Sequence, residues 1–296
     1  MSIFTGAGVA VVTPFHGSGA INYGSYENLI NFLLENGADA IITCGTTGEA
    51  PTLTDEEQIE AIGFAARVVN GRVPVIAGVG SNDTYHGMKL CRGAAAGGVD
   101  ALLMQTPYYN KTTQNGLVKH FGMMAGSTDL PVILYNIPGR TGMNIDAKTM
   151  AELIKIENIV GVKESSSNFT LASEYVELCG DKFEMYSGED GLISPLLGLG
   201  ARGVISVLAN IAPRKAHDLV MKFLEGDTAG SLRLQIEMLP LVRALFCEVN
   251  PIPVKTALNM MGFDVGGLRP PLFEMEPQNA ERLRQEMVRY GLELKG

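Results

Sequence analysis

The sequence has few of the residues that build metal clusters and disulfide frameworks, and it has no tryptophan. Its four cysteines, Cys44, Cys91, Cys179 and Cys247, stand far apart, and no two of them have CxxC spacing. The four histidines show neither an HxxxH nor an HExxH pattern. These absences argue against a zinc cluster or a disulfide framework, and we expect no metal site.

Basic residues, long apolar runs and nucleotide-binding loops are also scarce. Thirty-two acidic residues against 23 basic ones give a net charge of −9, which disfavours nucleic acid and anionic membranes as partners. No apolar run reaches the roughly 18 residues of a membrane span, and the first residues lack the basic region and cleavage site of a signal peptide. Neither a GxxxxGK[ST] loop nor a complete GxGxxG fingerprint is present. We therefore expect a cytoplasmic protein whose side chains carry any chemistry without a cofactor.

Eight short segments rich in Val, Ile and Leu recur, each followed by a longer segment of helical character. They are Gly6–Phe15, Ala40–Gly45, Val73–Gly80, Ala101–Pro107, Pro131–Pro138, Ile159–Ser165, Phe183–Gly188 and Gly203–Ala209. Their spacing of about 20 to 35 residues is the size of one βα unit. Their interiors do not alternate polar with apolar residues, as is typical of parallel strands that are covered on both faces.

Local turn and capping signals agree with this pattern. Gly37, Gly98 and Gly200 stand where a helix would end in the left-handed conformation before the next strand. Helix starts are indicated by Thr54-Asp55-Glu56-Glu57 and by Pro213. Eight units of near-constant length predict an α/β fold, a closed (β/α)₈ TIM barrel. The alternative is an open doubly wound sheet, which normally has fewer strands and a glycine-rich nucleotide loop.

The strand-like segments stop after about Gly226. Ser231–Val249, Pro253–Met261 and Pro277–Leu292 are predicted to be three helices. We therefore expect a catalytic barrel over residues 1–225 and a C-terminal helical extension over residues 226–296 that packs on the barrel.

In a barrel of this kind, catalytic groups lie at the C-terminal ends of the strands. Lys163 ends an apolar strand, where a lysine is costly to bury unless it is neutral or paired. One interpretation is an amine that desolvation keeps uncharged, so that it attacks a carbonyl and forms an imine. The other is an ordinary strand-end lysine paired with Glu164. Tyr135 on the preceding strand could exchange protons with the carbinolamine, although an aromatic residue in a strand is more often part of the core.

Two neighbouring loops offer groups that bind carboxylates. Thr46 and Thr47 stand in a glycine-flanked turn, whose hydroxyls and backbone N–H groups suit a carboxylate, although such a turn is often only a turn. Arg140 could clamp a second carboxylate; a lone loop arginine is otherwise a surface charge. Ser187-Gly188-Glu189 and Ile205-Ser206 end the last two predicted strands.

Four motifs carry a resemblance to a known family. GTTGE, TPYYNK, YNIPGRTG and GVKESS follow or end the second, fourth, fifth and sixth predicted strands. In this order they resemble the pyruvate-dependent lysine (class I) aldolases of the N-acetylneuraminate lyase superfamily. Within it the chain is most similar to the dihydrodipicolinate synthase family, from GAGVA near the start through NPIPVK near residue 255.

The resemblance implies that Lys163 forms an imine with pyruvate. Tyr135, Thr46 and Tyr109 would form a proton relay, with Tyr109 reaching in from a partner subunit of a tight dimer. The pyruvate enamine would add to L-aspartate 4-semialdehyde, and cyclisation would release 4-hydroxy-tetrahydrodipicolinate, a precursor of diaminopimelate and lysine. The family implies a homotetramer of two tight dimers and no cofactor.

The same resemblance implies the binding residues. Thr47 would hold the pyruvate carboxylate and Arg140 the carboxylate of the semialdehyde, while Gly188 and Ile205 would line the imine pocket. A related alternative is N-acetylneuraminate lyase or another sugar-acid aldolase. Those enzymes usually read GSTGE and lack the arginine after YNIP, so Thr46 and Arg140 favour the synthase. A third alternative is a barrel that has lost its chemistry and serves as a ligand-binding regulator.

Lysine-inhibited members of the family bind lysine in a cleft at the dimer interface. The matching positions in this chain are Ala50, Pro51, Asp55, Gln58, Asn82, His86 and Tyr108. Strongly inhibited members typically have a glutamate where this chain has His86, and a histidine cannot replace that carboxylate toward an ammonium group. Asn82 and Tyr108 remain, and Asp55 is the group that could supply the missing charge. We therefore expect a residual allosteric cleft with weak or absent inhibition by L-lysine.

Overall fold

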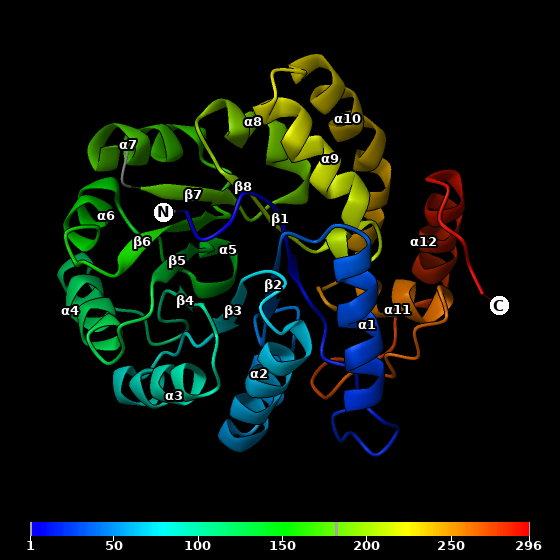
Figure 1. Ribbon diagram of the computed structural model, residues 1–296, viewed down its shortest axis with the longest axis horizontal. Coiled ribbons are helices and arrows are strands. Elements are labelled where there is room, and N and C mark those ends of the chain that lie inside the picture. Colours follow the sequence, from blue (N-terminus) through cyan, green and yellow to red (C-terminus); the bar gives the residue numbers. More distant parts are fainter. Residues whose placement is uncertain (1, 181–182, 296) are drawn as a thin grey trace.

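A closed barrel of parallel strands forms the centre of the molecule (Figure 1). The computed structural model describes residues 2–180 and 183–295. The strands are β1 (Gly6–Ala10), β2 (Ala40–Thr43), β3 (Val75–Gly78), β4 (Ala101–Gln105), β5 (Val132–Asn136), β6 (Ile159–Glu164), β7 (Glu184–Ser187) and β8 (Gly203–Ser206). They pair in chain order, and β8 returns to pair with β1. The predicted (β/α)₈ barrel is confirmed, and the open sheet is excluded.

Helices surround the barrel and continue beyond it (Figure 1). They are α1 (Tyr23–Glu35), α2 (Asp55–Val69), α3 (Thr84–Ala96), α4 (Gln114–Ala125), α5 (Pro138–Thr141), α6 (Ala147–Leu153), α7 (Phe169–Cys179), α8 (Ile193–Gly198), α9 (Pro213–Leu224), α10 (Thr228–Leu245), α11 (Ile252–Met260) and α12 (Pro277–Arg289), with short 3₁₀ helices η1 (Ala50–Thr52), η3 (Asp190–Leu192) and η4 (Leu208–Asn210). Along residues 2–180 and 183–295, every helix is too short or too polar to cross a bilayer.

Apolar side chains fill both faces of the barrel wall. One cluster inside the barrel includes Ile42, Ile76 and Ile133, and Phe4 stacks on Tyr186 with ring centroids 4.4 Å apart. A larger cluster fills the space between the strands and the surrounding helices. Because both faces are buried, the strands show no polar–apolar alternation.

The capping and turn signals of the sequence are confirmed. The Thr54 hydroxyl accepts the backbone N–H of Glu57, and the Glu57 carboxylate accepts that of Thr54, which forms a capping box at the start of α2. Gly37, Gly98 and Gly200 all have positive φ where the chain turns from a helix into the next strand.

The C-terminal helices pack on one side of the barrel. Helix α10 contacts α8, α9 and α12, and the buried side chains of α12 include Leu283 and Met287, as its apolar pattern predicts. The chain between α10 and α11 returns to the C-terminal mouth of the barrel, where Asn250 lines a cavity. The division into domains at residue 225 stays a prediction, and contacts cross it.

Candidate active site

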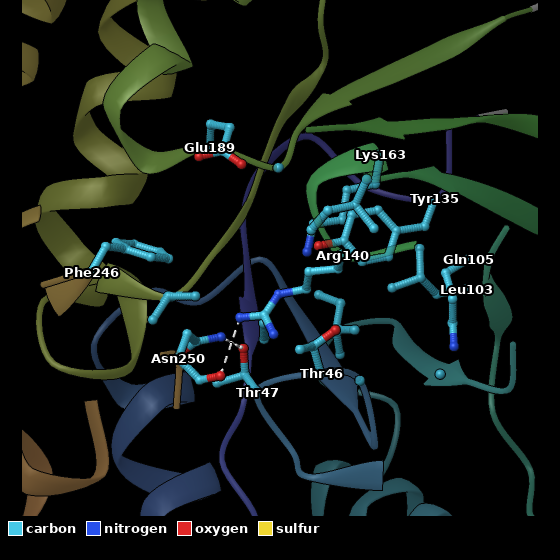
Figure 2. Close-up of a pocket in the computed structure, with 17 residues that line it drawn as sticks. Thr46, Thr47, Leu103, Gln105, Tyr135, Arg140, Lys163, Glu189, Phe246 and Asn250 are labelled. Carbon is cyan, nitrogen blue, oxygen red and sulfur yellow. Dashed lines mark hydrogen bonds between the residues drawn. The ribbon is translucent and has the colours of Figure 1, made fainter. Parts of the chain in front are cut away.

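A cavity of about 170 Å³ opens at the C-terminal mouth of the barrel (Figure 2). It brings together five of the residues predicted from the sequence: Lys163, Tyr135, Thr46, Thr47 and Arg140. They come from the ends of β6 and β5, the loop after β2, and α5. The strand-end rule for barrels therefore selected residues that lie together around one cavity.

Lys163 and Tyr135 lie side by side on neighbouring strands. They are paired in the register of β5 and β6, and their exposed fractions are 6% and 7%. The Lys163 Nζ lies 4.2 Å from the centroid of the Tyr135 ring. Among the described residues no hydrogen bond or ion pair reaches this amine.

Glu164, the neighbour that could have paired with Lys163, lies on the other face of β6. Its carboxylate accepts hydrogen bonds from the Asn136 side chain and the Ser166 backbone. Successive residues of a strand point to opposite faces, so the two side chains are separated by the barrel wall. Burial raises the pKa of Glu164. The interpretation of Lys163 as an ordinary strand-end lysine paired with Glu164 is wrong.

Gly188 makes room for the lysine. A Cβ atom at Gly188 would lie 2.9 Å from Lys163 Cε and would overlap the Ser165 hydroxyl. Any side chain here would displace the amine, so Gly188 contacts the predicted imine position as expected. Ile205 is buried inside the barrel, but the cavity is lined by Val207 instead.

The loop after β2 presents the Thr47 hydroxyl with its proton free. Thr47 Oγ1 accepts a hydrogen bond from Asn250 Nδ2 at 2.9 Å. Since a hydroxyl has one proton and this bond occupies an oxygen lone pair, the proton remains available to an acceptor in the cavity. The Thr13 hydroxyl donates to the carbonyl of Gly48 in the same loop at 2.7 Å, which fixes the turn.

Arg140 reaches across the mouth of the cavity from α5. Its Nη2 donates to the backbone oxygen of Asn250 at 3.2 Å, and Figure 2 shows Asn250 joined to both Arg140 and Thr47. Asn250 thus fixes the two predicted carboxylate-binding groups relative to each other. Its Oδ1 is buried without a hydrogen bond in the described part of the chain.

The predicted proton relay is not complete within one chain. Thr46 lines the cavity, but no hydrogen bond joins it to Tyr135 within the described ranges. Tyr109 follows β4 with a φ of +69° and is 90% exposed, outside the cavity of its own chain.

Sequence reasoning missed two polar residues of the cavity, Asn250 and Glu189. Asn250 belongs to the NPIPVK segment, which is part of the resemblance to the family, but the sequence alone assigns no function to this residue. Glu189 directly follows Gly188 at a catalytic strand end, which was the available signal. Burial, and then the neighbouring Asp190, raise the pKa of Glu189 to about 6. Elsewhere in the described residues no three His, Cys, Asp or Glu side chains gather as a metal site requires.

A second cavity, of about 160 Å³, shares Thr46 with the first. Its lining includes most of the predicted allosteric positions, namely Ala50, Pro51, Asp55, Gln58, His86 and Tyr108. Asn82 lies beside it and donates to the backbone oxygen of Tyr108 at 3.3 Å. The Asp55 carboxylate already contacts His86 Nε2 at 2.8 Å and Lys89 Nζ at 2.7 Å. Its charge is therefore engaged within the chain.

Comparison with known proteins identifies the family. The model of the Dihydrodipicolinate synthetase family matches residues 3–289. The chain belongs to this family. A 4-hydroxy-tetrahydrodipicolinate synthase of Lachnoclostridium phytofermentans is 56% identical over 293 residues, which cover 99% of this chain and 100% of that protein.

Solved structures agree with this family assignment. Dihydrodipicolinate synthase from Aquifex aeolicus superposes with a TM-score of 0.97 at 45% identity, over 99% of this chain and 100% of that one. The enzyme from Cyanidioschyzon merolae, solved with lysine bound, has a TM-score of 0.96 at 39% identity, over 99% of this chain and 100% of that one. The predicted family and synthase activity are confirmed, and these relatives do not support the sugar-acid aldolase alternative.

Proposed function

We propose that the protein joins pyruvate to L-aspartate 4-semialdehyde through an imine on Lys163 and releases 4-hydroxy-tetrahydrodipicolinate. The observation that carries this proposal is a buried amine without a hydrogen-bond or ion-pair partner in the described structure, beside a phenol and facing two carboxylate-binding groups. Such an amine, once uncharged, is a nucleophile for a carbonyl.

The first half-reaction uses Lys163, Tyr135 and Thr47. Thr47 donates its free proton to the carboxylate of pyruvate. The Lys163 nitrogen attacks the keto carbon, and Tyr135 returns a proton to the departing oxygen, which leaves as water. Loss of a proton from the methyl carbon then converts the imine into an enamine.

The second half-reaction needs Arg140. Its guanidinium binds the carboxylate of the semialdehyde, and the enamine carbon attacks the aldehyde carbon to form the new carbon–carbon bond. The amine of the semialdehyde then attacks the imine carbon and displaces Lys163. This closes the ring and regenerates the free enzyme, with no cofactor required.

Trapping with borohydride tests the first half-reaction. The protein is incubated with pyruvate and reduced, and its tryptic peptides are weighed. We expect a stable pyruvyl adduct on Lys163, and its absence would contradict the proposal. Comparing L-aspartate 4-semialdehyde with N-acetylmannosamine as acceptor then separates the synthase from a sialate lyase.

We propose further that Tyr109 completes the relay of a partner subunit in a tight dimer, with two dimers forming a tetramer. The exposure and positive φ of Tyr109 support this, because an exposed tyrosine held in a strained backbone conformation suggests a contact outside its own chain. Four free cysteines support the cytoplasmic location that we retain from the sequence.

Subunit complementation tests the shared site. Lys163→Ala and Tyr109→Phe are each expected to be inactive or weakly active alone. In a mixed dimer, one site combines the intact Lys163 of one subunit with the intact Tyr109 of the other. Random co-assembly should restore about a quarter of wild-type activity. Mixtures no more active than the separate variants would contradict the partner role of Tyr109.

A further inference from the structure

Two adjacent acidic residues, Glu189 and Asp190, follow β7 and differ in their hydrogen bonds. The buried carboxylate of Asp190 accepts hydrogen bonds from the Ser206 hydroxyl and from the backbone N–H groups of Val207 and Leu208. It holds the loop after β8 in place. The carboxylate of Glu189 lines the active-site cavity and has no hydrogen bond or ion pair among the described residues.

The backbone of Glu189 is fixed although its carboxylate has no partner. The Ser187 hydroxyl and the Leu192 N–H both donate to the Glu189 carbonyl at 3.0 Å. A half-buried carboxylate without a partner costs free energy, because it gives up water without gaining a hydrogen bond. Its position at the edge of the proposed catalytic cavity points to a ligand that supplies the missing partner.

The charges of the cavity indicate which ligand group this is. Its charged lining residues are Lys163, Arg140 and Glu189, two cations and one anion. In the proposed function, Arg140 binds a carboxylate and Lys163 forms the imine. Only the second substrate carries a cation, its α-ammonium group, since pyruvate has none. In the view of Figure 2, the Arg140 guanidinium stands between Glu189 and Thr47.

From this arrangement we infer that the Glu189 carboxylate binds the α-ammonium group of the semialdehyde while Arg140 binds its carboxylate. This inference rests on the proposed function and deepens it. Together with the aldehyde at the enamine, the two contacts fix three substituents of the α-carbon, as selection of one enantiomer of an α-amino acid aldehyde requires. They also direct the nitrogen that later displaces Lys163 toward the cavity.

Another acceptor of the cavity, the buried Oδ1 of Asn250, also has no hydrogen bond within the described residues. A carboxylate binds an ammonium group more strongly than an amide oxygen does, because the hydrogen bond is charge-assisted on both sides. The charged acceptor is therefore the one that we assign.

The test compares two aldehydes that differ only in the ammonium group. L-Aspartate 4-semialdehyde is measured as substrate and succinate semialdehyde as a competitive inhibitor, for the wild type and for Glu189→Gln. The variant keeps the shape of the side chain and removes its charge. We expect kcat/KM for the amino aldehyde to fall about ten- to a hundredfold, the effect of losing a charged hydrogen bond. The inhibition constant of succinate semialdehyde should stay close to that of the wild type.

Controls separate this inference from folding and from the proposed function. Glu225→Gln removes the same charge from an exposed position at the end of α9. It should change neither the kcat/KM of the amino aldehyde nor the inhibition constant of succinate semialdehyde. Glu189→Asp keeps the charge, so it should recover part of the kcat/KM for the amino aldehyde that Glu189→Gln loses. Borohydride trapping of pyruvate on Lys163 should remain complete in Glu189→Gln, which shows that the variant is folded and competent for the first half-reaction.

Each other outcome overturns the inference. If Glu189→Gln weakened the binding of both aldehydes equally, Glu189 would support the shape of the cavity and would not bind the ammonium group. If neither the kcat/KM of the amino aldehyde nor the inhibition constant of succinate semialdehyde changed, the ammonium group would bind elsewhere, with Asn250 Oδ1 as one of the other acceptors. Loss of the pyruvate adduct in Glu189→Gln alone would assign Glu189 to the imine step. Absence of the adduct in the wild type would instead contradict the proposed function.

Discussion

Two buried lysines of this chain stand in similar packing but in different polar surroundings. Lys163 and Lys255 are 6% and 1% exposed, and each has its Nζ 4.2 Å from the centroid of an aromatic ring, Tyr135 or Phe15. Three oxygens accept the ammonium protons of Lys255: the Glu49 carboxylate at 2.8 Å and two backbone carbonyls at 2.9 and 2.6 Å. Lys163 has no such acceptor within the described chain.

The comparison separates a structural ammonium group from the amine that we propose to be reactive. Burial lowers the pKa of Lys255, while the Glu49 carboxylate opposes that shift. With all three donors used, Lys255 joins α11 to the turn that ends in Glu49 and carries Thr46 and Thr47. Burial alone therefore does not make a lysine a catalyst. The absence of acceptors, together with access to a cavity, distinguishes the two.

Replacing the reactive lysine is the most direct way to break the comparison. Lys163→Ala should eliminate the pyruvate adduct and lower kcat by more than about a thousandfold, the scale for loss of a nucleophile. The fold should survive, because the removed amine has no polar partner, although a small cavity forms. Mass spectrometry after borohydride and a urea titration measure both properties. Turnover at a sizeable fraction of the wild-type rate would disprove the mechanism.

Replacing the structural lysine, Lys255, should have the opposite effect: the protein should lose stability and keep its reaction with pyruvate. Lys255→Met leaves the Glu49 carboxylate buried without its partner, which should lower the free energy of unfolding by about 3–5 kcal/mol. Molecules that remain folded should still trap pyruvate on Lys163. Urea titrations of Lys255→Met, Glu49→Gln and the double variant measure the coupling between the two residues. If Lys255→Met were as stable as the wild type, the assigned role of this ion pair would be wrong.

Arg140 sharpens the comparison by separating the two half-reactions at one cavity. Arg140→Ala should leave the pyruvate adduct on Lys163 intact, since that step does not use the second carboxylate. The kcat/KM for L-aspartate 4-semialdehyde should fall about ten- to a hundredfold, because one charged hydrogen-bonding partner is lost. Equal losses in trapping and turnover would show that Arg140 instead supports the cavity through its contact with Asn250.

Glu189 adds a titrating group to the surroundings of Lys163. Burial and Asp190 raise its pKa to about 6, and Glu164 adds to this rise, while Lys163 and Arg140 oppose it. Because the folded state then binds this proton more tightly than the unfolded state, stability should fall as the pH rises from about 4.5 to 6. The cost at neutral pH is at most about 2 kcal/mol, reduced by partial exposure of the carboxylate.

Glu189→Gln should remove this cost. Urea titrations at pH 4 and pH 7.5 should give equal stabilities for variant and wild type at the lower pH, and a more stable variant at the higher one. This is the expected trade between stability and a functional carboxylate without a partner. A variant that is less stable at pH 7.5 would indicate that the charged carboxylate has a stabilising partner in the folded protein.

The fold was predictable because its signals are local. Apolar strands, which recur eight times, a capping box at Thr54 and left-handed glycines such as Gly37 and Gly98 each act over a few residues. The rule that barrels place chemistry at strand ends then located Lys163 and Tyr135. Distinguishing Lys163 from a lysine paired with Glu164 needed only the alternation of side chains along a strand.

The rest of the site depends on contacts that no local pattern encodes. Asn250 reaches Thr47 across 203 positions of the chain, and Lys255 reaches Glu49 across 206. The carboxylate of Asp190 has hydrogen-bond donors around it, and the carboxylate of the adjacent Glu189 has none among the described residues. This difference depends on the three-dimensional arrangement and not on the local sequence. Tyr109 contributes nothing to the cavity of its own chain, so its predicted role requires a second subunit.

A third lysine extends the comparison to the predicted allosteric cleft. Lys89 is exposed, and with His86 it contacts the Asp55 carboxylate at the edge of the second cavity. These contacts lower the pKa of Asp55, with Lys89 as the first cause. A free L-lysine would have to compete with both residues for that charge. His86 also stands where we expect strongly inhibited members of the family to have a glutamate. We therefore expect weak or absent inhibition.

The smallest predicted effect is thus the inhibition of the wild type by L-lysine, and one substitution should strengthen this inhibition. L-Lysine is titrated against the synthase reaction at saturating pyruvate, and half-inhibition is expected only at millimolar concentrations or above, about −4 kcal/mol of binding. His86→Glu supplies a carboxylate and frees Asp55 from one of its partners, so it should tighten inhibition by about one decade or more. The control is Lys155→Gln, which removes an exposed lysine paired only with Glu152 and should leave inhibition unchanged. Half-inhibition of the wild type far below a millimolar would show that Asp55 binds the ligand in spite of His86 and Lys89.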